Sequence, residues 1–215
     1  MVTVTTVLAV LGAYLLGAIP TSVWIGKAVY GIDIREHGSG NAGASNTFRI
    51  LGVKAGIPVL VFDLFKGFLA VKIVGLFHMF IPGTTAYINF QIILGAAAVL
   101  GHVFPIYVGF KGGKGVATLM GLVLAIHTPS ALIAAGIFVV MLLLSKYVSL
   151  SSMIAGLSFP VMLIGIFQET VNSLIIFSIV ISIALLFTHQ QNIERLLKRE
   201  ESKANLFRRR RKRNL

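Results

Sequence analysis

Residues 101–118, GHVFPIYVGFKGGKGVAT, change from apolar to glycine- and lysine-rich and back to apolar without a break. Gly112, Gly113 and Gly115 lack a Cβ, so the backbone here can adopt left-handed conformations that turn successive N–H groups inward. Such a nest binds anions, and a helix beginning after Gly115 would add the positive end of its dipole. The stretch therefore predicts an anion-binding loop between two membrane segments.

Two lysines, Lys111 and Lys114, bring full positive charges to this loop, and phosphate is its natural ligand. The alternative interpretation is a flexible cytoplasmic hinge whose lysines follow the positive-inside rule. His102 and Pro105 upstream make the pattern more specific than the glycines alone.

The composition is that of a polytopic membrane protein. Of 215 residues, 56% are hydrophobic and 12% are charged, and the mean hydropathy is +0.90. Cysteine is absent, which excludes disulfides, a thiol nucleophile and cysteine-ligated metals. The five histidines are scattered without metal-ligand spacing. We expect neither a metal nor a cofactor.

The positive charge is concentrated at the C-terminal end of the chain. The net charge is +12, and ten of the nineteen lysines and arginines lie between Arg195 and Arg213. Because these residues directly follow a membrane segment, they favour anionic lipids of the inner leaflet over nucleic acid. We divide the chain into a membrane domain, residues 1–204, and a basic cytoplasmic tail, residues 205–215.

Apolar runs predict the membrane-spanning helices. The run at 116–126 is short and is followed by a turn at 127–130, so it and the next run form either one kinked span or two short ones. Two spans place all the basic loops on one face, as the positive-inside rule requires. We therefore predict an all-α protein of seven spans, with the N-terminus outside and the C-terminus inside: residues 7–26, 55–80, 87–104, 116–126, 131–144, 148–167 and 171–188.

Two further polar segments lie on the same predicted face. Residues 38–49 are rich in glycine and in short polar side chains, and Arg49 offers a bidentate fork for phosphate; the alternative is a solvated turn between helices. In residues 189–195, His189, Asn192 and Arg195 share one side of a continuing helix, although a lone histidine there is more often an interfacial residue.

The second predicted span contains ionisable residues, which in a membrane segment are candidates for function. Asp63 and Lys66 are three residues apart, so they can pair on one face of the helix. We interpret them as a structural pair that orients the loop above rather than as catalytic groups.

These segments resemble the bacterial acyl-phosphate:glycerol-3-phosphate acyltransferase family, PlsY. The resemblance rests on GSGNAGASN at 38–46 with Arg49, on residues 101–118, and on His189 with Asn192. It implies a seven-span enzyme of the bacterial inner membrane whose active site faces the cytoplasm. The implied reaction moves an acyl chain from acyl-phosphate to the 1-hydroxyl of glycerol 3-phosphate, giving lysophosphatidic acid and inorganic phosphate. The implied partners are these two substrates and membrane lipids, with no nucleic acid.

On this resemblance we assign the site residues. The catalytic candidates are Ser39, Arg49, Lys114, His189 and Asn192. The substrate-binding candidates are Gly40, Asn41, Gly43, Asn46, His102, Lys111, Gly112, Gly113 and Gly115.

Two routes for the hydroxyl proton follow from the same residues. His189 or His102 could act as general base, or the phosphate of the donor could accept the proton. We favour the second route, because a cationic site lowers the pKa of a histidine. The competing class of protein is a transporter of phosphate-bearing solutes, but transporters usually bind near the membrane midplane and often contain repeats.

Overall fold

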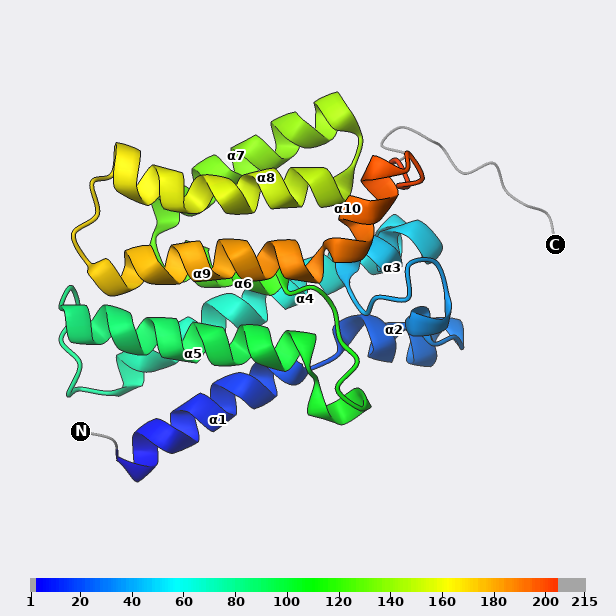
Figure 1. Cartoon of the computed structure of the whole chain (residues 1–215). Helices are drawn as coiled ribbons and strands as arrows, with labels where there is room; N and C mark the ends of the chain where they lie inside the picture. The colour runs from blue at the N-terminus through cyan, green and yellow to red at the C-terminus, as the bar shows by residue number, and fades with distance from the viewer. Residues whose placement is uncertain (1–2, 205–215) are drawn as a thin grey trace.

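The computed structural model describes residues 3–204, which form an elongated helical bundle (Figure 1). The helices that run along the bundle are α1 (Val4–Ala18), α4 (Val53–Lys72), α5 (Thr85–Val103), α6 (Val116–Ile126), α7 (Thr128–Ser145), α8 (Val148–Val161) and α9 (Asn172–Thr188). The shorter helices α2 (Thr21–Tyr30), α3 (Ala44–Ile50) and α10 (Gln190–Leu197) gather at one end, which we call the loop end. α1 begins at the opposite, far end (Figure 1).

Single-turn segments complete the chain. They are the 3₁₀ helices η1 (Ile34–Glu36), η2 (Ile73–Leu76) and η3 (Ile106–Val108), and the π-helical η4 (Met162–Ile166) that extends α8. No strand occurs within residues 3–204, and the predicted all-α fold is confirmed. The predicted basic tail, residues 205–215, lies outside the described residues.

The helices meet the requirements of a membrane span to different degrees. α5 with η3, α7, and α8 with η4 are long and apolar enough on their own. Two bent pairs, α1 with α2 and α9 with α10, qualify if each pair is one span. α6 has only 11 residues. α4 has 20 residues, but it carries Lys54, Asp63, Lys66 and Lys72. The number of seven crossings stays a prediction.

The surface of the bundle fits a lipid environment. The 18 residues of α7 have a mean hydropathy of 2.1, yet only 17% of this helix is buried inside the protein. Large side chains on it, among them Leu132, Val140 and Leu144, are more than half exposed. A helix that is apolar on all sides and not covered by protein is stable only when lipid surrounds it.

The first predicted span is divided into two helices. α1 ends at Ala18, and α2 continues from Thr21 at an angle of 40°. Pro20 cannot donate a backbone hydrogen bond, which accounts for the break. The second span is shorter than predicted, because α4 ends at Lys72 rather than near Phe80.

The predicted turn at residues 127–130 was wrong, because three of these four residues are already helical. α7 already begins at Thr128, with Pro129 in its first turn, where no backbone donor is needed. His127 caps the helix, because its Nδ1 accepts a hydrogen bond from the Ser130 N–H at 3.2 Å. The sequence HTPS is therefore a helix start that joins α6 to α7 with almost no loop.

Glycines allow α4 and α6 to pack backbone against backbone. A Cβ on Gly67 would collide with the carbonyl oxygen of Thr118, and a Cβ on Gly121 would collide with that of Leu64. Small residues at a helix crossing permit this approach in membrane proteins. The contact fixes the helix that carries Asp63 and Lys66 against the helix that follows the glycine-lysine loop.

The seven-span topology can be tested by single cysteines at Thr128 and Lys146. These residues lie at the two ends of α7, which crosses from the far end to the loop end (Figure 1). We expect a membrane-impermeant thiol reagent to label position 128 in intact cells and position 146 only after permeabilisation. The natural chain has no cysteine and is the blank. Labelling of both positions from one side would contradict the topology.

Candidate functional site

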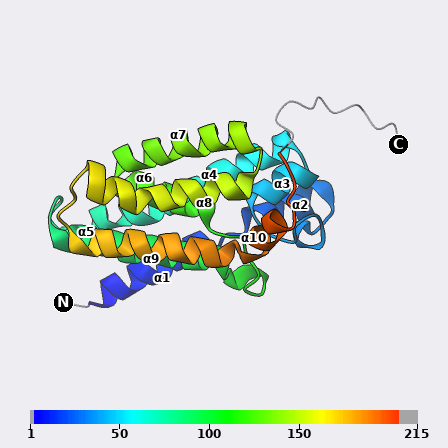
Figure 2. The ribbon, with the colours of Figure 1, turned by 45° about the horizontal axis from the view of Figure 1, so that its top comes forward.

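The three polar segments of the sequence meet at the loop end, where α10 lies at the same end as α2 and α3 in both views (Figures 1 and 2). The N–H of Ala42 donates to the carbonyl of Gly112 at 3.4 Å, which joins the first segment to the second. The Lys114 ammonium donates to Oδ1 of Asn192, which joins the second segment to the third. Contacts between distant parts of the chain thus assemble one site.

The glycine-lysine loop does not form the predicted nest. The N–H groups of Gly112 and Gly113 donate to the carbonyls of Val103 and His102, both at 3.2 Å, so they are not available to an anion. Of the three loop glycines only Gly115 has a positive φ, 79°. The predicted left-handed nest was therefore wrong for Gly112 and Gly113. Glycine is needed at position 112 for a steric reason, because a Cβ there would collide with the His102 carbonyl.

The N-terminus of α6 is open to an anion. Gly115 is its N-cap and offers no side-chain acceptor to the first-turn N–H groups. These groups and the helix dipole favour a negative charge at this point. Lys114 immediately precedes the cap, and Lys111 is exposed at the start of the loop. This end of α6 therefore has the uncapped N–H groups that the predicted anion binding requires.

Lys114 is partly buried among other charged groups. The pKa of Lys114 is lowered to about 8, mainly by burial; the charges of Arg195 and Arg49 act in the same direction, whereas Glu201 opposes them. Lys114 is therefore mostly protonated at pH 7 and lies near two other cations. A cluster of three cations with one nearby carboxylate has an excess of positive charge that suits a phosphate dianion.

The carboxylate of Glu201 links three side chains of the site. Its Oε1 accepts hydrogen bonds from Asn192 Nδ2 and Ser149 Oγ, both at 2.8 Å, and its Oε2 accepts from Arg195 Nε at 3.1 Å. The Glu201 side chain is only 5% exposed. Because Glu201 holds the Nδ2 of Asn192, the Oδ1 of that amide is directed to Lys114.

Glu201 and Ser149 were absent from the predicted site. Glu201 reaches Asn192 because the chain reverses after α10: Arg199 has a φ of 60°, and the N–H groups of Glu200 and Glu201 both return to the Arg195 carbonyl. A non-glycine residue in the left-handed region is not predictable from composition. The sequence did carry a signal for both residues, because residues 146–152, which contain Ser149, and Glu201 after the last motif also resemble the family.

His189 lies beyond the last residue of α9, where α10 turns away at 60°. Its Nδ1 is 2.8 Å from the Leu185 carbonyl, which can only accept, so Nδ1 carries the proton of the neutral ring and Nε2 is left as an acceptor. Burial lowers the pKa of His189 to about 4, and the charge of Lys114 acts in the same direction. The imidazole is therefore neutral at pH 7.

Asn46, predicted to bind substrate, is used to hold its own loop. Its Nδ2 lies within 3.2 Å of the carbonyls of Ile34, His37 and Asn41, and its Oδ1 accepts from the Ser39 N–H at 3.0 Å. The side chain is 2% exposed. Its polar atoms are thus occupied within the protein, and the structure places Asn46 as a brace behind the loop.

The other residues of the first segment lie in the loop that Asn46 braces and in α3. Gly40 has a φ of 73°, and Asn41 donates to the Ser39 carbonyl at 3.2 Å. Gly43 is the N-cap of α3, and Arg49 is exposed in its last turn. Arg49 is close enough to affect the pKa of Lys114.

His102 lies behind the glycine-lysine loop rather than on its rim. Its Nδ1 is 3.7 Å from Oδ1 of Asp63, and its Nε2 contacts the position where Gly113 would carry a Cβ. The predicted Asp63–Lys66 pair is present at 2.8 Å. Within residues 3–204, no three histidine or carboxylate groups come together in a way that could hold a metal ion.

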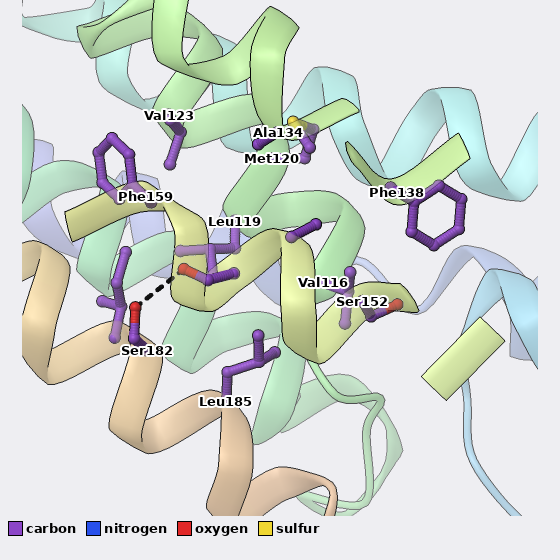
Figure 3. Close-up of a pocket in the computed structure, with 13 residues that line it drawn as sticks. Val116, Leu119, Met120, Val123, Ala134, Phe138, Ser152, Phe159, Ser182 and Leu185 are labelled. Carbon is purple, nitrogen blue, oxygen red and sulfur yellow. Dashed lines mark hydrogen bonds between the residues drawn. The ribbon is translucent and has the colours of Figure 1, made fainter. Parts of the chain in front are cut away.

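An apolar pocket lies between α6, α7, α8 and α9 (Figure 3). It contains about 530 Å³ of empty space, including the part that is open to the outside. Val116, two residues after Lys114, lines it, as does Leu185, whose carbonyl binds His189. Leu119, Phe138 and Phe159 continue the lining between the helices. The pocket thus begins beside the charged site and is suited to a hydrocarbon chain.

The arrangement defines an integral membrane protein with a cluster of cationic side chains at one end of a helical bundle and an apolar pocket next to it. The family model for glycerol-3-phosphate acyltransferase matches residues 7–199. The chain belongs to the glycerol-3-phosphate acyltransferase family, as the resemblance predicted.

Relatives and solved structures agree with this membership. The chain is 40% identical to the glycerol-3-phosphate acyltransferase of Chlorobium phaeobacteroides, covering 94% of this chain and 97% of that protein. It is also 40% identical to that of Fusobacterium nucleatum, covering 88% and 93%. The fold is similar to PlsY, an integral membrane glycerol 3-phosphate acyltransferase, in its glycerol 3-phosphate form, with a TM-score of 0.82 and 38% identity over 93% of this chain and 95% of that one. The lysophosphatidic acid form gives a TM-score of 0.79.

The carboxylate of Glu201 provides a test of how the site is held. We expect Glu201→Gln to lower kcat/KM by between about 10- and 100-fold, because Asn192 and Arg195 lose the group that orients them. We expect kcat/KM to fall at alkaline pH as Lys114 loses its proton. Glu201 raises the pKa of Lys114, so removing its negative charge should move this fall to lower pH. Steady-state kinetics from pH 6 to pH 10 measure both effects.

The exposed neighbour Glu200 supplies the matched control. Glu200→Gln removes the same charge without touching Asn192 or Arg195 and should behave as the parent. An equal decrease in both variants would show that Glu201 acts through general charge alone.

Proposed function

We propose that this acyltransferase uses acyl-phosphate as its donor. The acyl group passes to the 1-hydroxyl of glycerol 3-phosphate, and the products are 1-acylglycerol 3-phosphate and inorganic phosphate. The observation that carries the proposal is the position of Lys114 between an anion site and an apolar pocket. A donor that consists of a fatty acyl chain and a phosphate fits both features at once. The structures of PlsY with glycerol 3-phosphate and with lysophosphatidic acid support the second substrate and the product.

Two phosphate groups must be bound in this reaction. Lys114, Arg195 and Arg49 supply positive charge, and the open N-terminus of α6 supplies N–H donors. We assign Lys111, Ser39, Gly40, Asn41 and Gly43 to the same phosphate-binding surface. Charge neutralisation and alignment account for most of the rate, because an acyl-phosphate is already an activated mixed anhydride.

The chemical step needs no covalent enzyme intermediate. The 1-hydroxyl oxygen attacks the acyl carbonyl carbon, the new ester C–O bond forms, and the anhydride C–O bond breaks with its electron pair going to the phosphate. The hydroxyl proton passes to a phosphate oxygen of the donor, so the leaving group is hydrogen phosphate. Nε2 of the neutral His189 accepts a hydrogen bond from the 2-hydroxyl of glycerol 3-phosphate and so aligns the substrate, while the one proton of the 1-hydroxyl goes to the phosphate. Lys114 stabilises the developing phosphate charge.

The membrane position follows from the same site. The acyl chain enters the pocket between α6 and α9 from the lipid side, while both phosphates stay at the loop end. The loop end faces the cytoplasm of the bacterial inner membrane, where the basic loops belong.

Purified protein in detergent tests the donor. With glycerol 3-phosphate, we expect acyl-phosphate to give lysophosphatidic acid and inorganic phosphate in equal amounts. Acyl-CoA and acyl-carrier-protein thioesters should give no product, and glycerol without its phosphate should not be acylated. Product formation from a thioester, with acyl-phosphate inert, would overturn the proposal.

A further inference from the structure

A network of buried ionisable side chains lies beneath the active site and has no part in the step above. Asp63 and Lys66 of α4 have side chains that are 2% and 1% exposed, and His102 of α5 is 6% exposed. Lys66 Nζ lies 2.8 Å from Asp63 Oδ1 and donates to the Ile19 carbonyl at 2.9 Å. Charges at this depth carry a large desolvation cost and are retained where they have partners.

The network connects two places where the chain departs from helix. Ile19 is the residue at which α1 ends, and its carbonyl accepts from the Thr21 N–H at 3.1 Å, because the Val23 N–H that would reach it in a continuous helix donates to Pro20 instead. The hydroxyl of Thr21, the first residue of α2, donates to Asp63 Oδ1 at 3.4 Å. Asp63 and Lys66 therefore hold the break between α1 and α2 from the side of α4.

At its other end the network contacts the glycine-lysine loop. The His102 ring lies between Asp63 and Gly113, and the Gly113 N–H donates to the His102 carbonyl. The carbonyl of Gly112 in turn accepts from Ala42. A movement of His102 would therefore be transmitted to the loop that carries Lys114 and to the segment that carries Arg49.

A small pocket lies among the network residues, Ile19, Pro20 and Gly112; its empty space of about 180 Å³ includes the part that is open to the outside. The network thus lines the space between the α1–α2 break and the glycine-lysine loop.

We propose that Asp63, Lys66 and His102 are positioning residues that set the place of Lys114 relative to Arg49. None of them touches substrate in this assignment. The inference rests on the proposed function of Lys114 and Arg49 as phosphate ligands, but not on the identity of the acyl donor.

The double variant Asp63→Asn with Lys66→Met separates positioning from stability. It removes both buried charges together, which often leaves stability little changed, whereas a single replacement leaves one charge without a partner. We expect its thermal unfolding temperature in detergent to stay near that of the parent. Its kcat/KM for glycerol 3-phosphate should fall by between about 10- and 100-fold, because the phosphate ligands are displaced. Lys72→Met, an exposed lysine of the same helix, is the matched control.

Two variants of His102 test the positioning role if the double variant does not fold. His102→Asn keeps a side-chain donor that can reach Asp63, and His102→Leu has similar size without a donor. We expect His102→Asn to retain most of the parent kcat/KM and His102→Leu to lose about tenfold. Parent-like kinetics in the folded double variant, or equal kinetics in the two His102 variants, would overturn the proposal.

The assays use whichever acyl donor the parent enzyme turns over. An error in the donor assignment then appears in the parent enzyme, whereas an error in the positioning role appears only in the variants.

Discussion

Replacement of Lys114 by methionine should lower kcat/KM for glycerol 3-phosphate acylation by about 10²–10³-fold. Methionine keeps the apolar stem of the side chain but removes the ammonium that lies next to Asn192 and near Arg49 and Arg195. The lost interaction is made to a phosphate oxygen in a partly buried place, where a charge-assisted contact is strong. Arg49→Ala should have a smaller effect in the same direction, because Arg49 is exposed.

The measurement is steady-state kinetics of purified protein at equal concentration of folded enzyme. Lys54→Met, an exposed lysine in the first turn of α4, controls for the loss of one positive charge and should behave as the parent. The kcat/KM of Lys111→Met, in the glycine-lysine loop, should lie between that of Lys54→Met and that of Lys114→Met. Full activity of Lys114→Met and Arg49→Ala would refute their assignment as phosphate ligands.

The same lysine predicts the pH dependence. Because the pKa of Lys114 is lowered to about 8, its charge is present below that pH and is lost as the pH rises through it. The value of kcat/KM, which reports the free enzyme, should therefore fall above about pH 8. Lys114→Arg stays charged throughout this range and should lack the alkaline limb, whatever its absolute activity.

The second large effect concerns His189. We expect His189→Ala to lower kcat by about 10²–10³-fold, while His189→Asn and His189→Gln keep part of the activity. Asparagine can replace the Nδ1 donor to the Leu185 carbonyl, and glutamine can place an acceptor near the position of Nε2. Glutamine thus keeps an acceptor for the substrate, and asparagine keeps the contact with the Leu185 carbonyl, although neither amide can take up a proton near neutral pH.

The three His189 variants distinguish the two routes for the proton. If the donor phosphate accepts the proton, turnover at saturating substrate should decrease in the order parent, amide variants, alanine variant. If His189 is the general base, all three variants should lose activity about equally. The low pKa of the buried imidazole, about 4, is the structural reason to expect the first result. Equal and near-total loss would make His189 the base.

The class of protein, its helical fold and its family were predictable from the sequence. Composition and the lengths of apolar runs depend only on local chemistry, because every span must satisfy its own backbone in lipid. The Asp63–Lys66 pair was predictable for the same reason, since residues three apart in a helix are neighbours. The glycine-rich motifs likewise indicated which segments belong to the site.

Only the tertiary structure decided which atoms of those segments are available. The N–H groups of Gly112 and Gly113 are used by α5, and the amide of Asn46 is used by its own loop. Glu201 enters the site through a chain reversal at Arg199, and the proton of His189 is placed by the Leu185 carbonyl. A motif shows that a hydrogen-bonding group is present, but the partner of that group depends on what packs against it, often from a distant part of the chain. In this protein those partners leave Lys114, Nε2 of His189 and the end of α6 as the groups that we propose to meet the substrate.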